Sequence, residues 1–176
     1  MKRYTRCPVC GASIGRRSPD VLVCGACDFH LWLGSKPAVG AVVRRMIGGK
    51  GCVLLARRGI EPYKGMWDLP GGFLGNGERP EDGLARELRE ELGVAVSRPR
   101  LLATNIDEYP REDIAEEARF VLTLFYECEI PENAALQPAD DIVEAVWFPL
   151  DSLPEQIAFE GNRKILATLR ASPGSP

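Results

Sequence analysis

The spacing of apolar and polar positions changes along this chain, and it predicts where strands and helices lie. Two apolar runs, residues 38–45 and 52–58, flank Gly48-Gly49-Lys50-Gly51, which predicts a β-hairpin. Further apolar runs predict strands at residues 100–109, 118–130 and 142–149. Helical spacing returns near the C-terminal end, where Ile165, Leu166 and Leu169 predict a helix over residues 159–170. No internal repeat is found.

The most informative helix is predicted over residues 80–92. Pro80 suits the first helical turn, and Gly93 suits the position directly after the last turn. Within this segment one apolar stripe is expected to face a core, formed at i, i+4 and i+8 by Leu84, Leu88 and Leu92. Gly83 costs such a helix about 1 kcal/mol relative to alanine. Tertiary packing is therefore expected to help hold the helix.

A second face of the same helix carries three glutamates, Glu87, Glu90 and Glu91. They fall at i, i+3 and i+4, so their like charges repel unless a cation lies among them. Carboxylate oxygens suit Mg²⁺ or Mn²⁺. Glu78 precedes the helix, and Arg86 could pair with Glu78 or Glu90. A glutamate-rich face is usually solvated surface, but a loop with four glycines in residues 71–77 precedes this one, which favours a metal and phosphate site.

Nine positions of this segment form the pattern G-x5-E-x7-R-E-L-x-E-E-x-G-V, from Gly72 to Val94. At these positions the chain resembles the Nudix hydrolase family, whose signature is G-x5-E-x7-R-E-U-x-E-E-x-G-U with U aliphatic. The lead-in over residues 65–72, GMWDLPGG, is also similar to that family. The resemblance implies an α/β fold, an α/β/α sandwich with a mixed sheet. It also implies hydrolysis of a nucleoside diphosphate linked to another moiety.

The resemblance also assigns roles to single residues. Metal ligands would be Glu87, Glu90, Glu91 and the Gly72 carbonyl. Glu78 would be a further ligand or a carboxylate behind the ligands, and Arg86 would orient it. Many relatives carry an acidic residue where Gly75 stands, so a contact from that loop position is not carried over. A general base would remove a proton from a metal-activated water, and the candidates for it are Glu108, Glu112, Asp113, Glu116 and Glu117.

Four of the six cysteines form C-x2-C-x13-C-x2-C, through Cys7, Cys10, Cys24 and Cys27. Two such pairs can surround one Zn²⁺ as a structural zinc ribbon, and a glycine after Cys10 and after Cys24 would ease each turn. Disulfides are the disfavoured alternative, since a cytoplasmic location is expected. His30 is interpreted as a surface or packing residue. Cys52 and Cys128 lie in apolar runs and are expected to be buried.

Length and composition fit one ordinary domain with a small appendage. The chain has 176 residues, a hydrophobic content of 45% and a formal net charge of −3. This charge argues against a chain-wide nucleic-acid surface. No apolar run approaches the ~20 residues needed to span a bilayer, and no signal peptide is recognisable, so a cytoplasmic protein without a membrane partner is expected. The predicted organisation is a zinc ribbon (1–35), a linker at Lys36-Pro37, a Nudix domain (36–171) and a disordered tail (172–176).

Two classes of function compete. The leading hypothesis is hydrolysis of ADP-ribose, a dinucleotide or a nucleotide sugar. The layout resembles NADH pyrophosphatases, but their S-Q-P-W-P-F-P-x-S segment is absent. The alternatives are an RNA-end hydrolase or a regulatory protein that binds nucleotide or nucleic acid through the basic ribbon, and a homodimer stays open. Arg57 and Arg58 could meet phosphates, although charged strand ends usually face water. Candidates for stacking on a base are Tyr63, Phe73, Tyr109, Phe125 and Phe159. Trp67 and Trp147 are expected to fill the core, which is also the favoured placement for Phe125.

Overall fold

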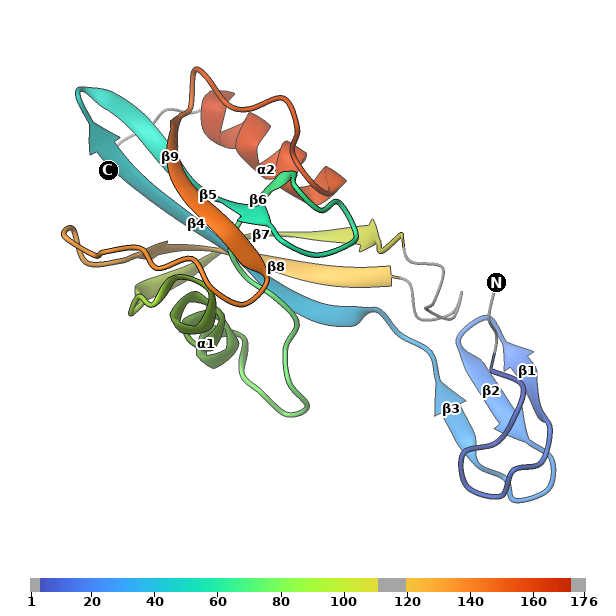
Figure 1. Ribbon diagram of the computed structural model, residues 1–176. Helices are drawn as coiled ribbons and strands as arrows, with labels where there is room; N and C mark the ends of the chain where they lie inside the picture. Colours follow the sequence, from blue (N-terminus) through green and yellow to red (C-terminus); the bar gives the residue numbers. More distant parts are fainter. Residues whose placement is uncertain (1–3, 111–119, 172–176) are drawn as a thin grey trace. The chain divides into compact units, whose positions relative to one another are not determined.

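The computed structural model describes residues 4–110 and 120–171 (Figure 1). These residues form two compact units. One comprises residues 4–36 with 108–110 and 120–121, and the other comprises residues 37–107 and 122–171. The predicted tail lies outside the described residues. No helix among the described residues is long and apolar enough to cross a membrane.

The N-terminal segment forms a three-stranded antiparallel sheet of β1 (Ile14–Ser18), β2 (Val21–Cys24) and β3 (His30–Trp32), in the order β1-β2-β3. Cys7, Ile14, Leu22 and Cys24 form its small buried core. Gly11 takes a left-handed backbone with φ of 73°, as expected for the first cysteine turn. In the second turn the left-handed residue is Asp28 and not Gly25, so the predicted role of that glycine is wrong.

A six-stranded sheet organises the remainder of the chain. Its strands are β4 (Lys36–Ile47), β5 (Lys50–Arg58), β6 (Trp67–Asp68), β7 (Ser97–Glu108), β8 (Phe120–Glu129) and β9 (Ile142–Pro149). The order is β6-β5-β4-β8-β7, and β9 also pairs with β5. The sheet is mixed, because β4 and β8 run in the same direction whereas β4 and β5 are antiparallel (Figure 1).

The two helices cover opposite faces of this sheet. Alternate strand residues point to opposite sides, so each helix packs against a different set of strand residues. On one face the leucines of α1 (Pro80–Leu92) pack against Val39, Ala41, Val43, Leu54 and Ala56. On the other face α2 (Glu160–Ala171) packs Ile165, Leu166 and Leu169 against Val42, Val53, Leu55 and Phe125. The result is the α/β/α sandwich that the resemblance implied.

Most predicted elements are confirmed, with shifts at their ends. The helix over residues 80–92 and the strand over residues 142–149 have the predicted bounds. Lys36-Pro37 begins β4 and is not a linker. Phe125, for which the core was the favoured placement, is only 1% exposed inside the core and is not available to stack on a base. As expected, Cys52 and Cys128 are buried, and Trp67 and Trp147 pack against the two cores.

Candidate functional site

Helix α1 and the glycine-rich loop before it approach each other closely, which sets the geometry of the site. Pro80 opens the helix, and Gly93 closes it with φ of 68° and an N–H that donates to the Arg89 carbonyl. A Cβ at Gly83 would lie 2.3 Å from Leu74 Cδ2. The absence of a side chain at Gly83 therefore leaves room for Leu74 of the loop against the helix.

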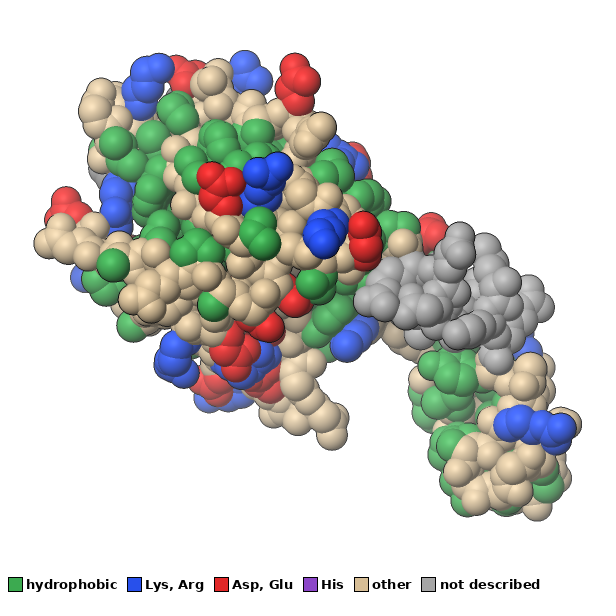
Figure 2. Space-filling view, viewed as in Figure 1, with side chains coloured by type: hydrophobic (Ala, Val, Ile, Leu, Met, Phe, Trp, Pro, Cys, Tyr) green, Lys and Arg blue, Asp and Glu red, His purple; other side chains and the backbone are tan. Residues whose placement is uncertain are grey.

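Arg86 lies at the centre of the acidic cluster. Its guanidinium donates to both carboxylate oxygens of Glu78 at 2.8 and 2.9 Å, to Glu87 at 2.7 Å and to Glu90 at 2.9 Å. It also donates to the Phe73 carbonyl at 3.0 Å. In Figure 2 acidic and basic side chains accordingly lie side by side over α1. The pairing was predicted with Glu78 or Glu90, and the structure has both.

Glu87 and Glu91 lie against the backbone of Gly71-Gly72. The Gly71 N–H donates to Glu91 Oε2 at 2.8 Å, and a Cβ at Gly72 would come within 2.6 Å of the Glu87 carboxyl. The Gly72 carbonyl accepts a hydrogen bond from the Val39 N–H at 2.9 Å. The absence of a side chain at Gly72 therefore lets the loop backbone lie against the Glu87 carboxyl.

Burial separates the pKa values of these carboxyl groups. Glu91 is 4% exposed, and burial, reinforced by the charges of Glu87, Asp68 and Asp141, raises its pKa to about 9. Burial also raises the pKa of Glu87, although Arg86 opposes this. By contrast, hydrogen bonds from Arg86 and from the Gly75 N–H lower the pKa of Glu78 to about 2. The site thus combines Glu78, which stays ionised, with the more buried Glu87 and Glu91, whose ionised forms are unfavourable.

Sequence reasoning missed a second polar group beside this cluster. Asp68 is buried and accepts hydrogen bonds from Arg58 Nη1 at 2.7 Å and from the amide of Asn162. Burial raises the pKa of Asp68, and Arg58 opposes that shift. Arg58 therefore does not simply face water, whereas the more exposed Arg57 donates to the Gly65 carbonyl. No local spacing links Asp68 with Asn162, so only the fold could reveal this group.

The four predicted zinc-ribbon cysteines come together. Their sulfur atoms all lie within 4.8 Å of one another, with Cys7–Cys27 at 3.6 Å and Cys10–Cys24 at 3.5 Å. The Ala26 N–H, opposed by burial, lowers the pKa of Cys24 to about 7. Within residues 4–110 and 120–171, no other set of three or more cysteine, histidine or acidic side chains has its ligand atoms this close together. His30 is not part of the cysteine group. The four cysteines are thus positioned to hold a metal ion.

The remaining predicted site residues are the candidate general bases. Glu108, a candidate general base, ends β7, whereas Glu112, Asp113, Glu116 and Glu117 lie outside the described residues.

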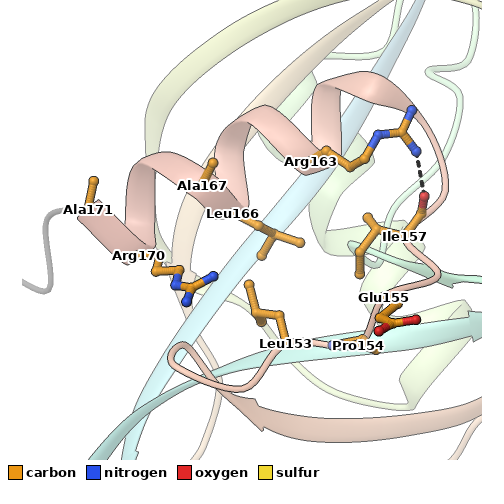
Figure 3. A pocket seen from close by; sticks show the side chains of 9 residues that line it. All are labelled: Leu153, Pro154, Glu155, Ile157, Arg163, Leu166, Ala167, Arg170 and Ala171. Atoms are coloured by element: carbon orange, nitrogen blue, oxygen red, sulfur yellow. Dashed lines mark hydrogen bonds between the residues drawn. The ribbon is translucent and has the colours of Figure 1, made fainter.

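A cavity of about 590 Å³ lies between α2 and the segment before it, lined mainly by Leu153, Ile157, Leu166 and Ala167 with Arg163 and Arg170 on its wall (Figure 3). None of the predicted site residues lines this cavity.

Comparison with known proteins gives a consistent result. Residues 34–169 match the NUDIX domain family. An ADP-ribose pyrophosphatase of Methanocaldococcus jannaschii is 30% identical over 81% of this chain and 78% of its own length. The NAD-capped RNA hydrolase NudC of Stutzerimonas stutzeri is 27% identical over 96% of this chain, which spans only 56% of that protein. A NUDIX hydrolase structure from Nitrosomonas europaea has a TM-score of 0.74 and 25% identity, covering 95% of this chain and 90% of that one.

Proposed function

This chain belongs to the NUDIX domain family, and on that premise we propose that it hydrolyses the diphosphate linkage of a nucleoside diphosphate derivative. ADP-ribose is the leading substrate, and NAD-type dinucleotides follow. The observation that carries the proposal is that every defined position of the pattern from Gly72 to Val94 is matched. The carboxylates of this segment lie against the Gly71-Gly72 backbone and Arg86. The similarity to an archaeal ADP-ribose pyrophosphatase supports the choice of substrate.

The oxygen donors in this cluster are of the kind that a divalent cation prefers. Glu87 and Glu91 are buried carboxyl groups with raised pKa values, so their negative charges need a compensating cation. Glu90, Glu87, Glu91 and the Gly72 carbonyl would hold Mg²⁺ or Mn²⁺. When bound, the ion would neutralise diphosphate oxygens and lower the pKa of a water molecule.

The protein groups position these ligands and move the proton. Arg86 ties Glu87 and Glu90 to Glu78, and the Gly71 N–H fixes Glu91. Glu78 stays ionised and anchors Arg86. A carboxylate must then accept the proton of the attacking water. Glu108 is the described candidate for this role, beside Glu112, Asp113, Glu116 and Glu117.

The cysteine cluster is proposed to hold one structural Zn²⁺. Sulfur–sulfur distances of 3.5 and 3.6 Å are close to the ~3.8 Å edge of a tetrahedron with metal–sulfur bonds of about 2.3 Å. Four thiolates close the coordination shell, so this ion would stabilise the small N-terminal sheet and would not activate water. Cys24, whose pKa is lowered to about 7, is the first thiol expected to ionise.

The test is product release from a panel of ADP-ribose, NADH, NAD, diadenosine polyphosphates, nucleotide sugars and dNTPs, with Mg²⁺ or Mn²⁺. We expect Mg²⁺-dependent cleavage of ADP-ribose that is abolished by Glu90→Gln and by Glu91→Gln. Asp82→Asn, an exposed acidic position on the same helix, is the matched control and should retain activity. Wild-type rates in either glutamine variant would refute the site assignment.

An RNA-end substrate is the second candidate. The similarity to an NAD-capped RNA hydrolase covers 96% of this chain and so includes the cysteine segment, whereas the NUDIX match begins at residue 34. NAD-capped RNA therefore belongs in the panel. Faster cleavage of capped RNA than of free NAD, with a salt-dependent KM, would favour this candidate. Equal rates on both would favour the small-molecule substrate.

A further inference from the structure

Two aromatic side chains from separate loops meet beside the acidic site. The rings of Tyr63 and Phe159 pack edge to face, with centroids 5.0 Å apart and an interplanar angle of 88°. Tyr63 belongs to the loop between β5 and β6, and Phe159 directly precedes α2. Both side chains are only partly buried. Long-range folding thus brings two partly buried aromatic rings together, nearly at right angles to each other.

Both residues adopt a backbone conformation that non-glycine residues avoid. The φ angle is 64° at Tyr63 and 53° at Phe159, each in the left-handed region. Bulky residues stay in that region only where surrounding contacts hold them, and such positions cluster at ligand-binding sites. The Met66 N–H donates to the Tyr63 carbonyl, and the Ala158 N–H donates to the Trp67 carbonyl, so both loops are held in place.

A chain of contacts connects the aromatic pair with the acidic cluster. The Arg58 guanidinium lies 5.0 Å from the centre of the Phe159 ring and donates to Asp68 at 2.7 Å. Asp68 is three residues before Gly71, whose N–H holds Glu91. Arg58 and Asp68 therefore connect the aromatic pair with the chain segment that leads to Gly71 and Glu91.

We propose that Tyr63 is a stacking platform for the nucleobase of the substrate, braced by Phe159 and Arg58. This inference rests on the proposed function and adds which end of the substrate is recognised and by which residue. An aromatic face stacks on any nucleobase, since every base has a flat π surface. Arg58, which is paired with Asp68, holds the Phe159 ring that Tyr63 packs against. Substrates without a base would gain nothing from the platform.

Binding of AMP and of ribose 5-phosphate to the full chain tests this proposal, measured by isothermal titration. Tyr63→Leu keeps an apolar side chain but removes the flat face, so AMP should bind about 10-fold or more weakly. Ribose 5-phosphate should bind as it does to the wild type. Tyr63→Phe should restore AMP binding, and Ile60→Ala, an exposed apolar position in the same loop, should leave it unchanged.

The same variants separate the platform from the hydrolysis itself. If Tyr63→Leu raises KM for ADP-ribose and leaves kcat unchanged, the platform acts in binding, as proposed. Unchanged AMP affinity in Tyr63→Leu, or equal losses for AMP and ribose 5-phosphate, would overturn the platform while hydrolysis could stand. If AMP binding depends on Tyr63 but no panel compound is hydrolysed, the platform stands and the proposed function fails.

Discussion

Replacing Glu91 with glutamine should abolish hydrolysis and, in magnesium-free protein, make the fold more stable. The two effects have opposite signs because the same buried carboxylate is needed by the cation and disfavoured without it. Glutamine has nearly the shape of a protonated glutamic acid, and its amide oxygen can still accept the Gly71 N–H bond that Glu91 accepts at 2.8 Å. The substitution therefore removes the charge and keeps the geometry.

The magnitude follows from the pKa of Glu91, which is raised from 4.5 to about 9. In magnesium-free protein the folded state then keeps its proton up to about pH 9, whereas the unfolded chain releases it near pH 4.5. Folding stability is therefore full below pH 4.5 and is lost as the pH rises toward 9, by about 1.4 kcal/mol per pH unit. At about pH 7.5 the loss is ~4 kcal/mol, and glutamine should recover about 2–4 kcal/mol of it.

Thermal unfolding between pH 5 and 9, in buffer dialysed free of Mg²⁺ but without chelator, measures this effect and spares a cysteine-bound metal. A gain of about 2–4 kcal/mol corresponds to a Tm increase of roughly 5 °C or more, growing with pH. Glu90→Gln is the matched control, because its side chain is 48% exposed and should change Tm little. A Glu91→Gln variant that melts at or below the wild-type Tm across this range would refute the reasoning.

Three other predictions follow from single contacts. Gly83→Ala should destabilise the protein although alanine favours helices, because its Cβ would lie 2.3 Å from Leu74 Cδ2, and adding Leu74→Ala should restore part of the lost Tm. Cys7→Ser combined with Cys24→Ser should remove the single equivalent of zinc that elemental analysis is expected to find in reduced wild-type protein, and full zinc retention would contradict the site. Arg86→Lys should reduce kcat by about 10-fold or more, since lysine cannot reproduce the paired guanidinium bonds, and an unchanged kcat would dismiss that role.

Local signals in the sequence were sufficient for the helix that carries the site. Pro80, Gly93 and the leucine spacing act within a few residues, and the structure places the helix at residues 80–92 with the leucines fully buried. The cysteine cluster could likewise be predicted, because two C-x2-C pairs encode their own turns. The metal ligands inferred from the same segment stay a proposal.

Contacts between distant segments could not be predicted in this way. Asp68, Arg58 and Asn162 lie on three different elements, and only the packing of β5, β6 and α2 brings them together. The reason for a glycine at position 83 could not be predicted either. The cost of a helical glycine is local, whereas the space that Gly83 leaves is occupied by Leu74 from the preceding loop. Lys-Pro at residues 36–37 predicts a linker, yet both residues belong to the start of β4.

The two ways of holding carboxylates in this site have different consequences for its chemistry. Arg86 keeps Glu78 ionised with a pKa of about 2, so the anchor of the cluster carries its charge whether or not a cation is present. A neutral backbone N–H holds Glu91, so its charge depends on the cation. Carboxyl groups whose environments push their pKa values apart take different roles. The shared arginine thus presets the geometry, while the buried glutamate couples the protonation of the site to metal binding.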